Sequence, residues 1–201
     1  VLVYGSWSEG FRLGSGGQFQ SEACSAAGIN VGGIESDRSE NLEFGTKLSF
    51  DDNRITLNAA IFRVNWDDIP VFVSSASSGG FGTCTRTENA GTATTEGVEL
   101  EVQARLTEYL RMDISASYLE SVLNEDALSL GVGAVKGANL PGSADYNLSA
   151  ALQYDFTLAN HDSFARLDYS YIAEYYNKFT ETGPSAGDFG QINLSMGMSS
   201  D

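Results

Sequence analysis

The chain has 201 residues and a formal net charge of −16, from 27 acidic against 11 basic side chains. This length suits a single domain, and the acidic excess argues against nucleic acid as a partner, because phosphate binding needs clustered Lys and Arg. The sequence contains no run of 18 apolar residues, so it predicts no membrane-spanning helix. The acidic excess either recruits divalent cations or simply keeps the loops solvated.

Eight stretches with alternating apolar and polar residues follow one another along the chain, which is the pattern of β-strands with two different faces. Their length is close to the ~9–11 residues that a tilted strand needs to cross a bilayer. In chain order, the predicted strands cover residues 1–11, 40–50, 55–66, 97–106, 110–118, 146–156, 165–171 and 192–198.

The first predicted strand leaves its faces open, because Val1, Val3 and Trp7 compete with Leu2 and Tyr4 for the apolar face.

The third predicted strand changes phase along its length. Up to Ile61 its apolar residues hold odd positions, whereas Phe62 and Val64 carry the bulk at even positions. An extra residue in one strand of a pair reverses the faces beyond it. The sequence therefore predicts a β-bulge near Ile61.

The connections between the predicted strands alternate between short and long. The short ones cover residues 51–53, 106–109 and 157–162, and the long ones cover residues 12–39, 67–93, 120–142 and 174–188. In an up-and-down antiparallel sheet every second connection lies on the same side. This asymmetry is typical of outer-membrane barrels, with short periplasmic turns and longer extracellular loops. The predicted fold is therefore all-β, an antiparallel up-and-down transmembrane β-barrel.

Charged side chains occupy the polar faces of several predicted strands, where contact with lipid would be costly. We expect them to face a polar lumen. A lipocalin-like soluble barrel also alternates, but its outer face usually carries many Lys, and these polar faces are richer in Asn, Ser, Gly and Gln. The predicted lumen-facing polar residues are Glu43, Lys47, Glu99, Glu101, Arg105 and Arg111.

Two cysteines, Cys24 and Cys84, lie in the first and second long connections, which the topology places on the same side. An oxidising periplasm or cell surface permits a disulfide between them. Two cysteines alone do not prove pairing over two free thiols, so the pair is a disulfide candidate.

The sequence offers no candidate catalytic residue and no candidate metal ligand, and it implies no cofactor. Its one histidine, His161, lies in a short turn, on the opposite side from both cysteines. The acidic pair Asp67 and Asp68 is better explained by turning the chain than by calcium binding.

Aromatic residues in the long connections are candidates for ligand binding, because glycans and aromatic chelators stack on such rings. The same rings could instead hold the loops together. These candidates are Phe19, Phe72, Phe81, Tyr175, Tyr176 and Phe179.

Several phrases in the sequence occur in a particular order: Tyr-Gly-Ser-Trp-Ser-Glu-Gly-Phe-Arg at 4–12, Glu-Asn-Leu-Glu-Phe-Gly-Thr-Lys at 40–47, Asn-Ala-Ala-Ile-Phe at 58–62 leading to Trp-Asp-Asp-Ile at 66–69, Asn-Ala-Gly at 89–91 leading to Glu-Gly-Val-Glu-Leu-Glu at 96–101, and Leu-Pro-Gly at 140–142. Together they resemble the C-terminal part of the β-barrel of TonB-dependent outer-membrane receptors. The resemblance runs from Tyr4 to Met198.

This resemblance implies a 22-stranded barrel, of which residues 1–201 form a single segment of about eight strands, in the outer membrane of a Gram-negative bacterium with the long loops extracellular. It further implies uptake of a scarce ligand, such as an iron-siderophore, haem, cobalamin or a glycan. The implied partners are outer-membrane lipid, a plug domain of the same full-length chain, the TonB complex through the missing N-terminal part, and the ligand. Glu99 and Glu101 would then meet a plug arginine or simply line the wall.

The chain departs from the whole family pattern, because it contains no plug, no TonB box and too few strands for so large a barrel. We therefore expect it to be a piece of a larger receptor. The alternative is a self-contained eight-stranded outer-membrane barrel with a structural or adhesion role, and a third reading is a soluble ligand-binding barrel. We expect no enzymatic activity from any of these.

Overall fold

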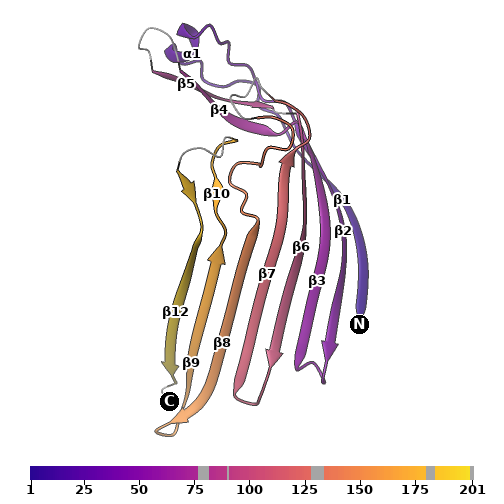
Figure 1. Ribbon diagram of the computed structural model, residues 1–201, viewed down its shortest axis with the longest axis vertical. Helices are drawn as coiled ribbons and strands as arrows, with labels where there is room; N and C mark the ends of the chain where they lie inside the picture. Colours follow the sequence, from indigo (N-terminus) through magenta and orange to yellow (C-terminus); the bar gives the residue numbers. More distant parts are fainter. Residues whose placement is uncertain (77–81, 90, 128–133, 180–183, 200–201) are drawn as a thin grey trace.

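The computed structural model describes residues 1–76, 82–89, 91–127, 134–179 and 184–199 (Figure 1). Eight long antiparallel strands form one sheet in which sequential long strands are neighbours. This confirms the predicted all-β, up-and-down architecture. The strands are β1 (Leu2–Arg12), β2 (Asp37–Phe50), β3 (Ile55–Asp67), β6 (Thr92–Arg105), β7 (Leu110–Leu123), β8 (Tyr146–Leu158), β9 (His161–Ile172) and β12 (Phe189–Met198).

The short connections all lie at one end of the sheet, and the long ones lie at the other (Figure 1). The tightest turn joins β8 to β9 through Ala159 and Asn160, which both have positive φ angles, 51° and 68°. Two such residues form the turn whose twist matches that of the flanking strands. We call the two ends of the sheet the turn end and the loop end.

The long connections carry the small elements of the structure. These are α1 (Glu22–Ala26), β4 (Pro70–Ala76), β5 (Thr83–Asn89), β10 (Tyr175–Tyr176) and β11 (Ser185–Ala186). Strands β4 and β5 pair with each other as a hairpin, and so do β10 and β11. Both hairpins therefore extend the loop end.

The predicted bulge near Ile61 is wrong. The register of β3 against β2 and against β6 continues without interruption past this residue. Phe62 lies on the polar face instead, directly opposite Gly97 of β6. Its ring occupies the room left by the missing side chain, since a Cβ on Gly97 would stand 2.9 Å from Phe62 Cζ. The change of phase in the sequence therefore reflects an aromatic residue that packs over a glycine of the neighbouring strand, with no extra residue in the strand.

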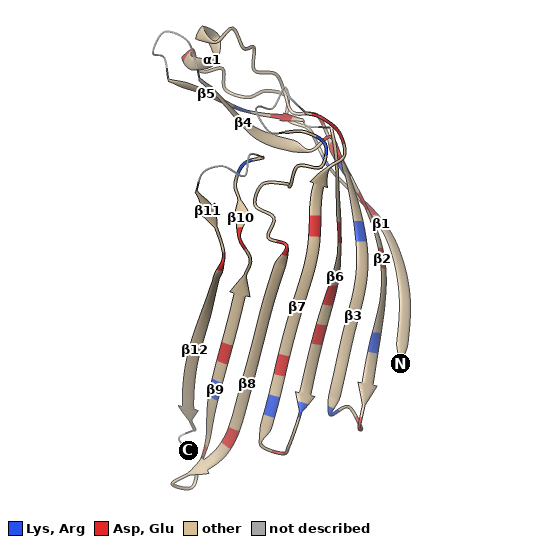
Figure 2. Ribbon diagram, viewed as in Figure 1, with Lys and Arg blue, Asp and Glu red and all other residues tan. Residues whose placement is uncertain are grey.

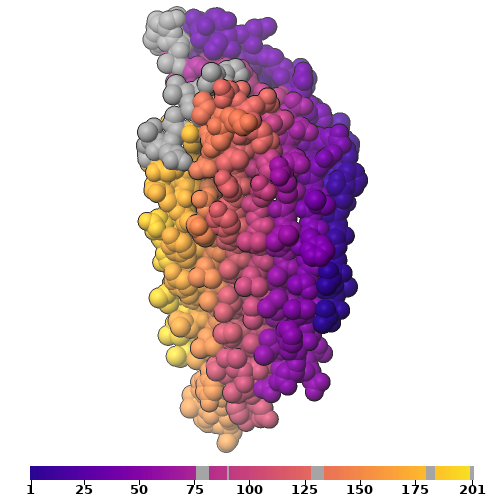
Figure 3. All heavy atoms as spheres, turned by 45° about the vertical axis from the view of Figure 1, so that its right-hand side comes forward, coloured from indigo at the N-terminus to yellow at the C-terminus, as the bar shows by residue number. Residues whose placement is uncertain are grey.

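The sheet has one polar and one apolar face, and the apolar face is uncovered within the described residues. Leu42 is 62% exposed, Ile192 is 69% exposed and Met196 is 71% exposed. Neighbouring strands form one continuous surface in the order of the sequence (Figure 3). So large an apolar surface marks a site of contact with lipid or protein.

No helix among the described residues is long and apolar enough to cross a membrane.

A compact apolar cluster lies at the loop end rather than between layers of the sheet. Its buried members are Ile69, Val73, Ala93, Leu123 and Ala134, and Trp66, Leu140 and Phe179 are among the residues that pack against it. The cluster draws on the connections after β3, β7 and β9. It therefore joins three of the four long connections into one unit.

The two edges of the sheet are open. Strand β1 pairs only with β2, and β12 pairs only with β9, among the described residues. A closed eight-stranded barrel requires pairing between β1 and β12, and this sheet does not have it.

Candidate functional site

The six residues predicted to face a lumen all lie on the polar face of the sheet. Glu43 and Lys47 lie on β2, Glu99, Glu101 and Arg105 lie on β6, and Arg111 begins the polar face of β7. Figure 2 marks acidic residues along β6 and β7 and basic residues near the turn end of these strands. The register brings the polar residues of β1 to β7 into common rows across the strands.

In the middle of this face, two carboxylates have neutral hydrogen-bond partners. Tyr4 Oη donates to Glu43 Oε1 at 2.7 Å, and Asn58 Nδ2 donates to Glu101 Oε2 at 3.2 Å. Among the described residues, Glu99 makes no side-chain hydrogen bond or ion pair. The centre of the polar face therefore presents carboxylates that are free to accept further donors.

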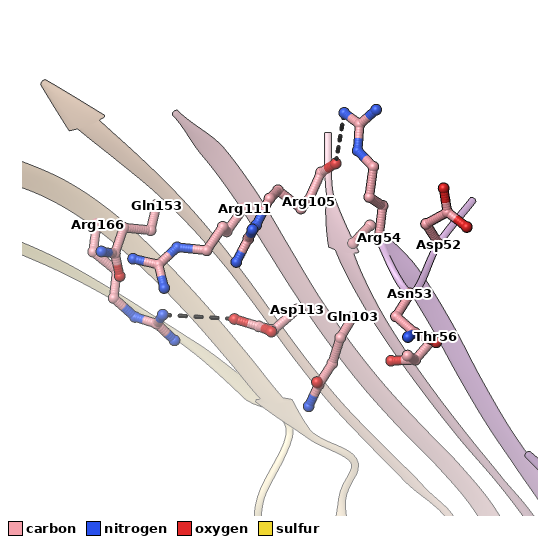
Figure 4. A pocket seen from close by; sticks show the side chains of 11 residues that line it. Asp52, Asn53, Arg54, Thr56, Gln103, Arg105, Arg111, Asp113, Gln153 and Arg166 are labelled. Atoms are coloured by element: carbon pink, nitrogen blue, oxygen red, sulfur yellow. Dashed lines mark hydrogen bonds and ion pairs between the residues drawn. The ribbon is translucent and has the colours of Figure 1, made fainter. Parts of the chain in front are cut away.

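A hollow of about 460 Å³ lies on the polar face near the turn end. Four arginines line it, one from a turn and three from strands: Arg54 precedes β3, Arg105 ends β6, Arg111 lies on β7 and Arg166 on β9 (Figure 4). Arg166 Nη1 lies 3.6 Å from Asp113 Oδ2, and this ion pair links β9 to β7 across the intervening β8. The hollow is thus polar, and its lining combines guanidinium and carboxylate groups.

At the loop end of the same face, Asp37 is buried and holds two partners. Arg12 Nε and Nη2 donate to its carboxylate at 2.7–3.0 Å, and Trp66 Nε1 donates to Oδ2 at 2.7 Å. The Arg12 guanidinium lies 5.5 Å above the Trp66 ring, in cation–π distance. This cluster fastens the loop ends of β1, β2 and β3 to one another.

Cys24 of α1 and Cys84 of β5 form a disulfide, with an S–S distance of 2.08 Å, and both residues are fully buried. The bond joins the connection after β1 to the β4–β5 hairpin, across 60 positions of sequence. The two predicted partners thus lie together in the structure.

Two side-chain amides strengthen the same junction. The Gln18 amide accepts from Thr87 N–H at 2.8 Å and donates to Thr87 O at 2.7 Å. The Asn89 amide likewise accepts from Glu35 N–H at 2.9 Å and donates to Glu35 O at 3.2 Å. Each side-chain amide donates to and accepts from the backbone of one residue, as the backbone of a paired strand does. These contacts attach the connection after β1 to β5.

The aromatic candidates for ligand binding do not converge on one place. Phe19 is 86% exposed in the connection before α1, and Phe72 is 70% exposed on β4. Tyr175 and Tyr176 form the half-buried β10, and Phe179 packs against the apolar cluster. Phe81 lies outside the described residues. As ligand contacts these residues remain predictions.

The structure brings no catalytic arrangement together. His161 lies at the start of β9, at the turn end, and the sulfurs of Cys24 and Cys84 are bonded to each other at the loop end. Among the described residues, no group of three or more His, Cys, Asp or Glu side chains is placed to hold a metal ion.

Comparison with known protein families gives a match over nearly the whole chain. The model of the family "TonB dependent receptor-like, beta-barrel" matches residues 1–199. The chain belongs to this family. Members of the TonB-dependent receptor family are outer-membrane proteins of Gram-negative bacteria and act in transport.

Solved structures of TonB-dependent receptors share the fold. The ferric yersiniabactin uptake receptor FyuA from Yersinia pestis matches 98% of this chain and 27% of its own length, with 20% identity and a TM-score of 0.73. The copper transporter OprC matches 96% of this chain and 28% of its own, at 18% identity and a TM-score of 0.66. BauA, the ferric preacinetobactin receptor from Acinetobacter baumannii, matches 96% and 26%, at 16% identity and a TM-score of 0.63.

The chain therefore spans about a quarter of the length of these receptors. Its eight-stranded sheet is part of a larger barrel, as its open edges also require. Sequence reasoning missed the cluster of Arg12, Asp37 and Trp66 and the amides of Gln18 and Asn89. The register of β1, β2 and β3 places Arg12, Asp37 and Trp66 together, and the folding of the connection after β1 against β5 places the two amides; the sequence pattern determines neither to the residue.

Proposed function

We propose that this chain forms part of the wall of an outer-membrane TonB-dependent transporter that takes up a scarce ligand, with its polar face toward the lumen and its apolar face toward lipid. The observation that carries this proposal is the uncovered apolar face on a sheet that matches the receptor family over residues 1–199. Strands of 10 to 14 residues are long enough to cross the bilayer and extend beyond it.

The same proposal places the long connections outside the cell and the short turns in the periplasm, as in other outer-membrane barrels. The disulfide is compatible with this orientation, because the cell surface and the periplasm are both oxidising surroundings in which disulfides persist. The loop end would then meet the ligand first, and the apolar cluster would hold three of its connections in place for that contact.

The ligand classes that we propose are an iron-siderophore, haem, cobalamin or a glycan, and iron-siderophores have the strongest support. FyuA is an uptake receptor for ferric yersiniabactin, BauA is a receptor for ferric preacinetobactin, and PiuA from Acinetobacter baumannii, at 21% identity, is a siderophore receptor. OprC, a copper transporter, adds a metal ion to the candidates. The exposed rings of Phe19 and Phe72 are the first contacts to test.

The partners that we propose follow from the same role. A plug domain of the full-length chain would fill the lumen and meet the free carboxylates of the polar face, including Glu99, which suits arginine donors on the plug. The TonB complex would act through that plug, and outer-membrane lipid would cover the apolar face. In this role the chain itself performs no enzymatic step.

The test is energised uptake by cells that carry or lack the intact receptor gene. The probes are radioactive iron loaded on a panel of siderophores, radioactive copper, haem, cobalamin and labelled oligosaccharides. The proposal predicts that deletion of the gene, or addition of a protonophore, abolishes uptake of at least one probe. Equal uptake of every probe by both strains would contradict it.

A further inference from the structure

Three arginines lie in one row across the polar face, close to the turn end. The register places Arg105 opposite Arg111, Arg111 opposite Gln153, and Gln153 opposite Arg166. We call Arg105, Arg111 and Arg166 the arginine row. Figure 4 shows its three side chains, from β6, β7 and β9, on the side of the sheet that carries the hollow of about 460 Å³.

Only two of the three arginines in this row pair with a carboxylate of the sheet. Arg111 Nη2 lies 3.0 Å from Asp155 Oδ2, and Arg166 Nε lies 2.9 Å from Asp168 Oδ1. The Arg105 guanidinium makes no hydrogen bond or ion pair with any described residue. It nevertheless stands directly opposite Arg111, and like charges in directly opposed positions destabilise a sheet. The row therefore lacks an anion at its Arg105 end.

We propose that Arg105 and Arg111 together hold a carboxylate of the plug domain at the turn end of the lumen. This inference rests on the proposed function, which places the polar face toward the plug. Guanidinium groups are planar forks that match carboxylate oxygens in pairs, so two neighbouring forks form a strong site for one Asp or Glu side chain. The hollow beside them has room for such a side chain.

The position of the row favours the plug over the transported ligand as the source of the carboxylate. The row lies at the turn end, whereas the ligand arrives at the loop end, which carries both hairpins and the apolar cluster. The receptors that match this chain are nearly four times its length, so most of each receptor lies outside the matched segment. A plug contact here would neutralise Arg105 and fix the plug to the barrel near the periplasm.

The test is hydrogen exchange of the full-length receptor in detergent or lipid, measured first without ligand and then with a bound probe that the receptor takes up. The variants are Arg105→Gln and the double variant Arg105→Gln/Arg111→Gln, and Arg105→Lys retains the charge without the fork. Arg63→Gln is the matched control, because Arg63 is also an exposed strand arginine, paired with Glu96 at 3.6 Å, but lies on the apolar face.

We expect amides of one plug segment to exchange roughly tenfold faster in the double variant, since a lost charge-assisted hydrogen bond has about that effect. Arg105→Lys should fall between, and Arg63→Gln should leave the plug unchanged. Unchanged plug exchange in the double variant would overturn the proposal. So would an equal increase in β6 and β7 themselves, which would show that the row stabilises only the wall.

The same variants separate this inference from the proposed function. If the unaltered receptor takes up a probe but plug exchange does not respond, the arginine site is wrong and the transport proposal stands. If plug exchange responds only when the probe is bound, the carboxylate belongs to the ligand, which overturns the plug contact. A receptor with no energised uptake contradicts the proposed function whatever its exchange shows.

Discussion

Phe62 of β3 lies directly across from Gly97 of β6, and its ring covers the position that a side chain at residue 97 would occupy. A Cβ there would also stand 2.5 Å from the backbone oxygen of Tyr118. The Phe62 ring therefore fills the space that Gly97 leaves open where β3, β6 and β7 run side by side. Tyr4 with Gly45 and Phe164 with Gly197 repeat the arrangement on the same face.

The Phe62–Gly97 pair predicts that Gly97→Ala destabilises the barrel. The added methyl group meets the backbone of β7, which cannot move aside as a flexible side chain can, so we expect a loss of about 1–3 kcal/mol. Gly5→Ala is the matched control, since its new Cβ would meet nothing closer than 3.8 Å. Thermal unfolding in detergent measures both, and an equal effect of the two substitutions would contradict the steric explanation.

The same pair shows where the sequence was sufficient and where it failed. Alternation alone predicted the eight strands, the two faces of every strand except the first, and the side of each connection, because these follow from a period of two and from connection length. It failed at Phe62, because a bulky residue on the polar face has the same pattern as a bulge. The difference depends on Gly97, which is 35 positions away in sequence and adjacent only after the strands pair.

The disulfide predicts that reduction loosens the connection after β1. Closing a chain segment of this length typically contributes about 2–4 kcal/mol, while each amide contact of Gln18 and Asn89 contributes about 1 kcal/mol and remains after reduction. Chymotrypsin cleavage after Phe19 should therefore become faster when reductant is added. The double variant Cys24→Ser/Cys84→Ser should be cut quickly with or without reductant. Cleavage of the unaltered protein at one rate in both conditions would count against this role.

The cluster at the loop end predicts that Asp37→Asn is destabilising. This substitution removes the charge that accepts from Arg12 and Trp66, and hydrogen bonds to a charged group contribute about 1.5–3 kcal/mol. Arg38→Gln is the control, because Arg38 pairs with Glu9 and Glu40 in exposed positions. Exposed pairs contribute only about 0.2–1 kcal/mol. Equal shifts in the thermal unfolding of the two variants would contradict the importance assigned to Asp37.

Chemistry at the candidate site was less predictable than the fold. The charged residues of the polar face could be named from alternation, but their partners could not. Arg105 and Arg111 were both expected to face a lumen, yet only the register shows that they stand opposite each other. The loop aromatics were chosen for residue type alone, and the structure gives them different surroundings, with Phe179 packed in the apolar cluster and Phe19 exposed.

The two faces predict opposite responses to a new arginine. Leu100→Arg places a charge on the apolar face, where contact with the middle of the bilayer costs roughly 2–4 kcal/mol. Ser115→Arg places the same charge on the polar face, opposite Glu101, and should cost little. Urea unfolding of the receptor in lipid vesicles compares them. A cost for Ser115→Arg that equals that of Leu100→Arg would argue against a lipid-facing side of the sheet.

The orientation of the sheet is measured most directly with single cysteines along β6 of the intact receptor in lipid vesicles, each labelled with a fluorophore. We expect quenchers attached to the acyl chains to reach labels at positions 98, 100 and 102, and water-soluble quenchers not to reach them. Labels at 99, 101 and 103 should show the opposite response. Quenching without this alternation, or with the two sets exchanged, would contradict a wall that separates lipid from a polar lumen.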